Sequence, residues 1–234
     1  MRPINKTRIL LLLLLFSFCR NTYAQNDSLR FEHIGIEEGL SNDHVTAILQ
    51  DSKGWIWFGT TDGLNKYDGY SFTKYRLDPF DSNSLSQNFI YTIWEDKYGS
   101  IWVSSFEGLC KFERSTEKFT RYKPSPKALF SDPNICSINE DNDGMMWVGS
   151  WSVGLCRFDR QTGMFLPEKF DLDGVNCICK SRDGTLWVGN STGLHRLNLT
   201  AVTGQTSRVS ITHYQHNPDN ASPILYNRGH NVAA

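Results

Sequence analysis

The stretch DSKGWIWFGTTDGL occupies residues 51–64, and related stretches return three more times along the chain. The other copies are DKYGSIWVSSFEGL at 96–109, DNDGMMWVGSWSVGL at 141–155 and SRDGTLWVGNSTGL at 181–194. Each copy contains a Gly, a Trp three residues later and then a Gly-Leu pair, and the first Gly recurs after 45, 45 and 40 residues. A repeat of this length is typical of propeller blades and other repeat arrays.

The residues inside one copy predict short antiparallel strands. The runs VTAILQ at 45–50 and WIWFGT at 55–60 are rich in β-branched and aromatic residues, and Gly54 suits the positive φ of a tight hairpin between them. Runs at 63–68 and 71–75 predict two further strands. Four short strands in about 45 residues make one propeller blade. We therefore predict an all-β partial propeller of four four-stranded antiparallel blades, with a complete four-bladed ring as the alternative.

Two residue types mark the same position in every copy. The Trp series is Trp57, Trp102, Trp147 and Trp187, and the Gly series is Gly54, Gly99, Gly144 and Gly184. A position shared by all blades is expected to serve the scaffold, whereas ligand contacts differ between blades. Each Trp can bury roughly 150–250 Å². We interpret both series as structural, with a ring of sugar-stacking platforms as the alternative for the Trp residues.

The repeat also divides the chain. Phe31-Glu32-His33-Ile34 resembles the last strands of blades at 72–75 and 119–122, and 216–227 resembles the connector at 77–88. We expect a truncated part of a larger propeller. The predicted segments are 1–24 signal peptide, 25–34 orphan strand closing a missing last blade, 35–76 blade 1, 77–122 blade 2, 123–166 blade 3, 167–214 blade 4 and 215–234 connector to an absent blade 5.

The first residues predict export. Arg2, Lys6 and Arg8 precede an apolar run over 9–18, and a short polar stretch ends at Ala24. This layout is typical of a secretory signal peptide, which we expect to be cleaved after Ala24, with an uncleaved anchor as the alternative. The apolar run is too short to span a bilayer as a helix. Without the leader's four basic residues, the 24 Lys and Arg fall to 20 against 25 Asp and Glu, so the net charge is −5 and nucleic acid is not an expected partner.

The cysteines and acidic turns carry no clear site. Five cysteines remain after cleavage, an odd number that cannot pair completely. Cys110 and Cys156 follow Gly-Leu pairs, and Cys177 and Cys179 face the same side of one predicted strand. We interpret them as small buried hydrophobes, with a disulfide or a metal site as alternatives. Asp141-Asn142-Asp143-Gly144 begins like a calcium loop but lacks the later acidic ligands, so we predict a turn, no metal and no cofactor.

The stretch GLSNDHVTAILQDSKGWIWFGTTDGLNKYDGYSF at 39–72 resembles the two-component regulator propeller repeat. The resemblance rests on Asp-x-x-Gly-x-x-Trp, Gly-Thr, Gly-Leu and Tyr-Asp-Gly, and covers about residues 30–227. It implies the periplasmic sensor region of a Bacteroides-type hybrid two-component histidine kinase, built from two seven-bladed propellers ahead of a membrane helix, a kinase, a receiver and a DNA-binding domain. Family members detect oligosaccharides and switch on glycan-utilisation genes. None of the downstream parts occurs in this sequence, so we predict no enzyme activity and no membrane span here.

Two other functions stay open. The segment SRDGTLW at 181–187 approaches the Asp-box of sialidases but lacks the residue between Asp and Gly, and the six His residues form no nucleophile motif. We therefore assign no catalytic residue. The other alternative is a secreted scaffold for protein interaction, and a sensor propeller could also form a homodimer through its sides.

A ligand is expected on one face of the propeller. The loops between the second and third strands and the connectors between blades emerge together there, and sugar recognition needs an exposed aromatic plane with amide or carboxylate groups around it. Trp151 is the main candidate because its loop is one residue longer than the others, with Phe106, Asp62, Asn88 and Asn190 as companions. The alternative is that Trp151 packs against the neighbouring blade. The expected partner is an oligosaccharide.

Overall fold

A computed structural model of the chain describes residues 31–168, 170–202 and 205–215. The chain divides into two units, Met1–His33 and Ile34–Ala234, and the strands of the described residues lie in the second. The signal peptide predicted at 1–24, residues 25–30 of the predicted orphan strand and the predicted connector beyond residue 215 lie outside the described residues. Residues 31–34 are described and form no strand. The role predicted for 25–34 stays a prediction.

The strands of the second unit fall into four groups of four. The first group is β1 (Val45–Gln50), β2 (Ile56–Thr60), β3 (Gly63–Tyr67) and β4 (Phe72–Tyr75). The second is β5 (Ile90–Glu95), β6 (Ile101–Ser105), β7 (Gly108–Glu113) and β8 (Lys118–Tyr122). The third is β9 (Ile135–Glu140), β10 (Met146–Ser150), β11 (Gly154–Asp159) and β12 (Met164–Phe165). The fourth is β13 (Cys177–Lys180), β14 (Leu186–Asn190), β15 (Gly193–Val202) and β16 (Gln205–Tyr214).

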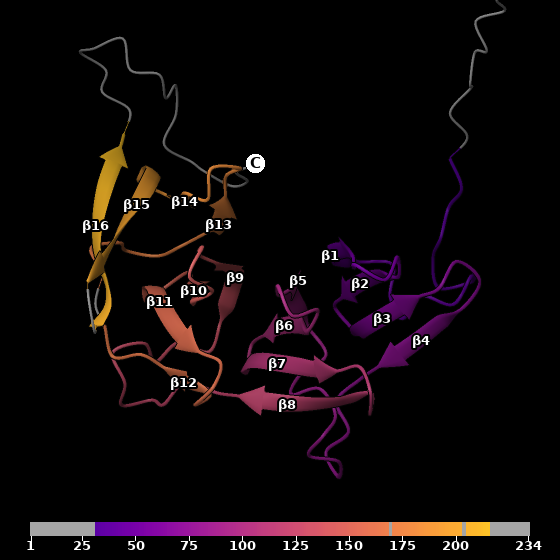
Figure 1. The fold of residues 1–234 in the computed structure, drawn as a ribbon. Coiled ribbons are helices and arrows are strands. Elements are labelled where there is room, and N and C mark those ends of the chain that lie inside the picture. The colour runs from indigo at the N-terminus through magenta and orange to yellow at the C-terminus, as the bar shows by residue number, and fades with distance from the viewer. Residues whose placement is uncertain (1–30, 169, 203–204, 216–234) are drawn as a thin grey trace, which may run out of the picture. The chain divides into compact units, whose positions relative to one another are not determined.

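Each group is one antiparallel sheet in which the strands pair in chain order. The first strands of the four sheets contact one another in succession, β1 with β5, β5 with β9 and β9 with β13. The last strands, β4, β8, β12 and β16, lie on the outer side, so the sheets follow one another in an open arc (Figure 1). This arrangement confirms the predicted fold class of four four-stranded antiparallel blades in an unclosed ring. The seven-bladed ring stays a prediction.

The turn before each repeated Trp is held by its own first residue and by a Gly. In the β1–β2 turn the Asp51 carboxylate accepts hydrogen bonds from Lys53 N at 2.9 Å and Trp55 N at 3.0 Å. Gly54 N donates to Asp51 O at 2.9 Å. The Gly at this position has a φ of +87° in Gly54, +79° in Gly99, +82° in Gly144 and +85° in Gly184. A side chain is strained at such angles, which explains why Gly returns in every blade.

The Gly of each Gly-Leu pair has a second reason to be Gly. A Cβ on Gly63 would lie 2.5 Å from Tyr75 O, and one on Gly108 would lie 2.3 Å from Tyr122 O. Carbon cannot approach a carbonyl oxygen so closely. The missing side chain therefore lets the last strand of the blade, or the chain that follows it, run directly past the start of the third strand.

The hydrophobic core lies between neighbouring blades. Trp57 of β2 packs edge-on against Phe112 of β7, with ring centroids 5.1 Å apart. Trp102 of β6 packs in the same way against Phe158 of β11, at 5.6 Å. Both Trp side chains are almost completely buried, at 0% and 1% exposed. At each of these two junctions a Trp of one blade therefore packs against a Phe of the next. The rings meet edge to face, which is an arrangement that aromatic rings prefer.

The other two Trp residues differ from each other. Trp147 of β10 is fully buried and contacts Phe170, which precedes β13 in the next blade, at 5.3 Å. Trp187 of β14 is only half-buried, and its ring lies 5.6 Å from Tyr214 of its own blade. The repeated Trp thus occupies the same strand position in every blade but not the same environment.

The five cysteines of the described residues are free thiols. Cys110 lies in the core between blades 1 and 2, and Cys156 lies in the core between blades 2 and 3. Burial raises the pKa of the Cys156 thiol to about 12 and raises that of Cys110 as well. These two cysteines agree with the interpretation as small buried hydrophobes.

Candidate functional site

The turns define two opposite ends of the blades, which we name the loop face and the hairpin face. The loop face carries the turns between second and third strands, at 61–62, 106–107, 151–153 and 191–192. The hairpin face carries the turns between first and second strands, at 51–55, 96–100, 141–145 and 181–185. In an antiparallel meander these two sets of turns must lie at opposite ends of the sheet.

Four aromatic side chains form a cluster on the loop face, which we name the aromatic patch: Phe89, Tyr91, Phe106 and Trp151. Phe106 lies 4.9 Å from Phe89 and 4.8 Å from Tyr91 between ring centroids. Tyr91 meets Trp151 edge-on at 4.7 Å, with an interplanar angle of 89°. Phe106 is 41% and Trp151 49% exposed. The structure therefore brings two of the predicted residues, from blades 2 and 3, into one half-exposed surface.

Trp151 has two roles in this geometry. Its ring contacts Tyr91 of the neighbouring blade, and about half of its surface still faces solvent. Its turn is held in place, because Val153 N donates to Ser150 Oγ at 3.0 Å and Ser152 Oγ donates to Asp132. Packing on Tyr91 of blade 2 fixes the ring and leaves about half of its surface exposed, so the two interpretations of Trp151 are compatible.

Asp132 provides a charged group beside the patch. Its Oδ1 accepts hydrogen bonds from Asn134 N at 2.9 Å and Asn134 Nδ2 at 2.6 Å. Burial raises the pKa of Asp132, but the hydrogen bonds from Ser152 and Asn134 outweigh burial and hold the pKa below its usual value. Burial, followed by the charge of Asp132, raises the pKa of the Tyr91 phenol. At neutral pH the patch therefore combines a neutral phenol with a carboxylate.

Asp62 and Asn88 form a second polar group on the loop face together with Arg76. Asp62 Oδ2 pairs with Arg76 Nη2 at 2.7 Å, and Asn88 Nδ2 donates to Asp62 Oδ1 at 3.4 Å. Asn88 Oδ1 accepts from Leu77 N at 2.7 Å. The Asp62 and Arg76 side chains are 40% and 44% exposed. The structure thus joins two predicted residues and adds an arginine that the sequence analysis did not single out.

Asn190 is placed differently from the other predicted residues, because it is buried at 2% exposure. Its Nδ2 donates to the backbone oxygens of Asp173 at 3.2 Å and Gly174 at 3.4 Å. Its Oδ1 accepts from Thr192 N at 2.8 Å and Gly193 N at 3.1 Å. Both ends of the amide are used inside the protein, where they brace the β14–β15 turn.

Two histidines face each other beside Asn190. His195 of β15 and His213 of β16 are direct partners in the strand register, and their Nδ1 atoms lie 2.9 Å apart. His195 Nε2 lies 2.8 Å from Asn190 Oδ1. Burial and the neighbouring His213 lower the pKa of His195 to about 4. Both rings line a hollow of about 400 Å³, which Asp171 and Asp173 also line.

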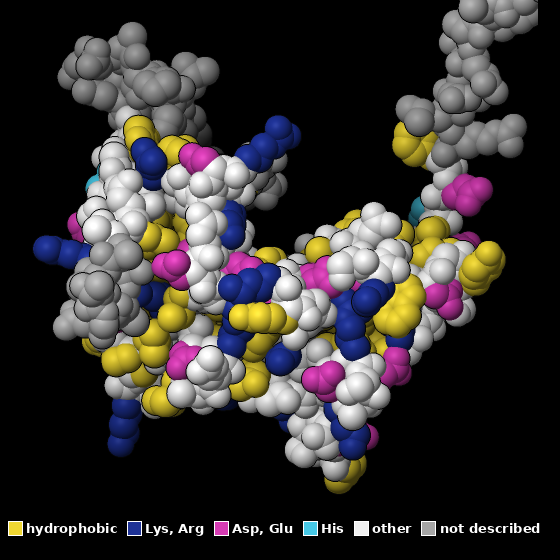
Figure 2. Space-filling view, viewed as in Figure 1, with side chains coloured by type: hydrophobic (Ala, Val, Ile, Leu, Met, Phe, Trp, Pro, Cys, Tyr) yellow, Lys and Arg dark blue, Asp and Glu magenta, His cyan; other side chains and the backbone are white. Residues whose placement is uncertain are grey.

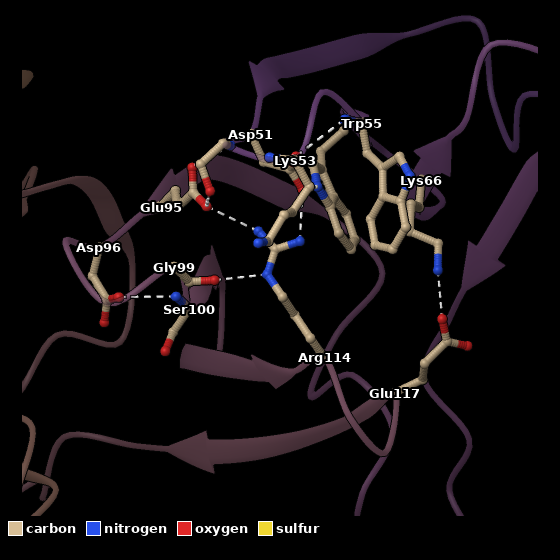
Figure 3. Close-up of polar contacts among 12 residues, drawn as sticks. Asp51, Lys53, Trp55, Lys66, Glu95, Asp96, Gly99, Ser100, Arg114 and Glu117 are labelled. Carbon is tan, nitrogen blue, oxygen red and sulfur yellow. Dashed lines mark hydrogen bonds and ion pairs between the residues drawn. The ribbon is translucent and has the colours of Figure 1, made fainter.

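The hairpin face carries an ion-pair group at the first junction, between blades 1 and 2. Arg114, just after β7, places its guanidinium between the carboxylates of Asp51 and Glu95 (Figure 3). The distances are 2.8 Å from Nη1 to Asp51 and 2.9 Å from Nη2 to Glu95, and Nε donates to Gly99 O at 2.7 Å. Asp51 also accepts from Trp57 Nε1 at 2.8 Å. Burial raises the pKa of Asp51, but the hydrogen bonds from Trp57 and Arg114 outweigh burial and lower it.

The second junction, between blades 2 and 3, repeats this arrangement. Arg160 Nη1 lies 3.3 Å from Asp96 and 3.0 Å from Glu140. Trp102 Nε1 donates to Asp96 at 2.9 Å. On the face in view, basic and acidic side chains lie beside one another across the middle of the molecule (Figure 2). Arg160 pairs with carboxylates of both blades at this junction, which makes Arg160, Asp96 and Glu140 scaffold groups.

The third junction, between blades 3 and 4, keeps only part of the pattern. Asp141 still accepts from Trp147 Nε1 at 2.9 Å. The position of the arginine is taken by Leu199, and the position of the glutamate by Lys180, whose Nζ donates to Asp141 O at 3.2 Å. Leu199 packs with other apolar residues against the core of this junction.

A hollow of about 680 Å³ on the hairpin face lies at the second junction. Tyr98, Asp141, Arg157 and Arg160 are among its lining residues. Arg160 is committed to Asp96 and Glu140, and Asp141 to Trp147. Two charged side chains that line this hollow are thus engaged in holding the blades, and we place the candidate ligand site on the loop face.

Two features are absent from the residues that the structure describes. Within residues 31–168, 170–202 and 205–215, no three His, Cys, Asp or Glu side chains gather closely enough to enclose a metal ion. The same residues contain no helix whose length and apolar character would allow it to cross a membrane.

Four meandering blades joined by Trp-centred junctions define an open β-propeller. Within it, residues 39–62, 129–152 and 170–192 match the family model described as two component regulator propeller. These three segments are therefore similar to two-component regulator propeller repeats, in agreement with the resemblance seen in the sequence.

Individual proteins of signalling systems are similar to this chain as well. Over 74 residues, 31% of this chain, the sequence is 46% identical to histidine kinase P4 of Formosa agariphila, of which the match covers 5%. The extracellular domain of a Bacteroides thetaiotaomicron signalling system, described as one-component, shares the fold with a TM-score of 0.66 at 24% identity. That match covers 88% of this chain and 26% of the other. The same extracellular domain, described as part of a hybrid two-component system, gives a TM-score of 0.63.

The fold is shared with enzymes as well. A virginiamycin B lyase from Staphylococcus aureus matches 77% of this chain and 58% of its own length, with a TM-score of 0.54 and 15% identity. Likeness at this level shows the propeller architecture alone, because one fold carries many unrelated functions.

Proposed function

We propose that this chain is part of the extracellular, periplasmic ligand-sensing propeller of a hybrid two-component histidine kinase, and that its aromatic patch binds an oligosaccharide. The repeat family and the relatives named above support the first half of the proposal. The patch itself supports the second. Control of glycan-utilisation genes would be the output of kinase and DNA-binding parts that act beyond the propeller.

The observation that carries the proposal is the composition of the patch. Phe106 and Trp151 expose rigid aromatic planes from two different blades, and Tyr91 lies between them. The apolar C–H faces of a sugar pack on such planes, while its hydroxyls need carboxylates and amides nearby. Asp132 beside Trp151 supplies a carboxylate held in its charged form. The patch therefore offers both kinds of contact that an oligosaccharide needs.

The position of the patch suits a sensor. Its residues come from the start of β5, the β6–β7 turn and the β10–β11 turn, so a bound chain of sugars would touch blades 2 and 3 at once. A ligand can shift an equilibrium between arrangements only by as much as it prefers one of them. A ligand that contacts both blades binds best to one arrangement of the two blades, and it can therefore shift the equilibrium toward that arrangement.

The test is a binding measurement on the full chain. Neutral and acidic oligosaccharides of plant and animal origin are screened, and the affinity of any that bind is measured by titration calorimetry for the wild type and for Trp151→Ala. We expect binding to weaken about tenfold or more, because a central aromatic contact typically contributes above about 1.4 kcal/mol. The matched control is Tyr98→Ala, an aromatic residue of the hairpin face that is 73% exposed, which should leave affinity unchanged.

Other outcomes would point to the alternatives. An unchanged affinity in Trp151→Ala would overturn the proposed site. Absence of oligosaccharide binding together with self-association of the chain would favour the scaffold and its homodimer. Chromatography of the same incubations would show shortened sugars if the chain were a sialidase-like hydrolase, and we expect the sugars to be recovered intact.

A further inference from the structure

The histidine pair at the end of blade 4 has a geometry that the proposed sensor function does not use. His195 and His213 stand opposite each other on β15 and β16, with 2.9 Å between their Nδ1 atoms. The two rings meet at 78°, with their centroids 4.9 Å apart. His195 is buried at 1% exposure, and His213 is exposed. The shared point between the two nitrogens can therefore be approached from the His213 side.

The hydrogen bonds around Asn190 fix where the protons are. An amide oxygen can only accept, so the 2.8 Å contact between His195 Nε2 and Asn190 Oδ1 places a proton on Nε2. The same oxygen also accepts from Thr192 N, Thr192 Oγ1 and Gly193 N. In the neutral ring the His195 Nδ1 is then a bare acceptor. His213 Nδ1 donates to it. The two nitrogens thus face each other across a single proton, which His213 Nδ1 carries.

We propose that His195 and His213 form a binding site for a borderline divalent transition-metal ion such as Zn²⁺, held through both Nδ1 atoms. The proton on His213 Nδ1 moves to its own Nε2 when the ion enters, so both rings stay neutral. Imidazole nitrogen is a preferred ligand of Zn²⁺ and Cu²⁺.

The distances allow the exchange of a proton for an ion. At a metal–nitrogen distance of about 2.0–2.1 Å, two nitrogens lie about 2.9 Å apart at a right angle and about 3.3 Å apart at a tetrahedral angle. The observed 2.9 Å matches the first distance and needs a small opening for the second. In both cases the ion lies beside the line between the two nitrogens, so each ring has to turn until its lone pair points at the ion. Metal-bound histidines usually donate their other ring N–H to a fixed acceptor, which Asn190 Oδ1 provides.

The surroundings complete the argument for a cation. The hollow of about 400 Å³ beside the rings is also lined by Asp171 and Asp173, whose carboxylates favour positive charge. The hollow leaves room for water at the positions that the two histidines do not fill. An open, two-histidine site of this kind binds more weakly than a closed structural site with four protein ligands.

The experiment uses the full chain and Zn²⁺ alone. Titration calorimetry measures Zn²⁺ affinity for the wild type, His213→Gln, His195→Gln and the control His44→Gln, whose histidine lies in the connector before β1. Nitrogen-15 NMR of the histidine rings reports which nitrogens the ion contacts. We expect one ion whose binding shifts the Nδ1 signals of His195 and His213. Affinity should fall about tenfold or more in both variants, at least the effect of losing even an orienting partner, and stay unchanged in His44→Gln.

Three results would overturn the proposal. They are no Zn²⁺ binding by the wild type, wild-type affinity in His213→Gln, or binding that leaves the two Nδ1 signals unmoved. His195→Gln could unfold the β14–β15 turn through Asn190, and a far-UV circular dichroism spectrum identifies that outcome. His213→Gln carries the test by itself in that case, because His213 is exposed and its loss leaves the turn intact.

Discussion

The first and third junctions both pack one blade against the next around the repeated Trp, but they surround the Trp with different residues. At the first, Arg114 of blade 2 joins Asp51 of blade 1 to Glu95 of its own blade, above a buried Trp–Phe contact. At the third, the Asp–Trp hydrogen bond remains, and Leu199 stands where the arginine would be. The repeat thus preserves the Trp and its carboxylate partner more strictly than the cation that neutralises the carboxylate.

The difference has an energetic meaning. A buried ion pair gains little over apolar residues of the same volume, because the cost of removing charges from water offsets their attraction. Replacing the whole group by apolar contacts is therefore acceptable, whereas removing one member leaves an uncompensated charge. The Trp has no such substitute, because it fills the space between two sheets. The comparison predicts that loss of a Trp costs most and exchange of a complete ion-pair group costs least.

The largest effect is expected for Trp102→Ala at the second junction. The substitution removes a side chain that is 1% exposed and leaves Asp96 without its indole donor. Truncation of such a buried aromatic residue typically costs about 3–5 kcal/mol. Urea unfolding of the full chain measures it, with Trp187→Ala as the matched variant. Trp187 is half-buried, so its loss should cost less than half as much, and equal losses would contradict the difference between the two environments.

A smaller but still large effect is expected for Arg114→Met. Methionine keeps most of the side-chain volume, but Asp51, whose side chain is 0% exposed, loses its cation. Removal of one partner from a buried pair costs about 3–5 kcal/mol, and the 21% exposure of Arg114 places this case at or below the lower end. Arg76→Met, which breaks an exposed pair, should cost about 1 kcal/mol or less. A similar loss of unfolding free energy in the two variants would show that the buried ion pair of the first junction stabilises the fold no more than the exposed pair does.

The scaffold could be predicted from the sequence because it repeats. Gly54 and Trp57 have counterparts at fixed spacing in every copy, and a β-hairpin needs only local information to be recognised. The ion pairs between blades could not be predicted in the same way. Arg114 and Asp51 lie in different repeats, so their meeting depends on how one sheet packs against the next.

The site could be predicted only where it breaks the repeat. Trp151 and Phe106 stand out as aromatic residues in loops, and the structure brings them into one cluster. Tyr91 lies in an ordinary strand, so nothing in the sequence singled it out. Asn190 was expected beside a ligand and is instead buried within its turn. The histidine pair was missed because β15 and β16 are ten-residue strands whose register the sequence does not define.

The carboxylate of the first junction predicts an acid-dependent effect. The folded-state pKa of Asp51 lies below the ordinary value of about 3.9. Its contribution to stability is then complete above that value and is lost as the pH falls toward the folded-state pKa. Comparison of the wild type with Asp51→Asn should give a gap in unfolding free energy that is constant from pH 7 to pH 5 and narrows below pH 4. In an Arg114→Met background the narrowing should be weaker, and an unchanged narrowing would assign the effect to the hydrogen bonds from Trp57 and Lys53.

The smallest net change is expected when the third junction receives the residues of the other two. Lys180→Glu alone places a second carboxylate near Asp141, and Leu199→Arg alone places a guanidinium among apolar side chains, so each should cost about 1–3 kcal/mol. The double variant assembles the complete ion-pair group, which should be close to neutral against the apolar version. A double-mutant cycle by urea unfolding would then give a coupling energy of about 1–3 kcal/mol. Additive losses would show that position 199, which pairs with Val209 inside the long β15–β16 hairpin, holds its side chain out of reach of Asp141. In that case the backbone of the long β15–β16 hairpin explains why the third junction is apolar. The first and third junctions would then differ because of where the backbone places residue 199, and the difference in charge would follow from that.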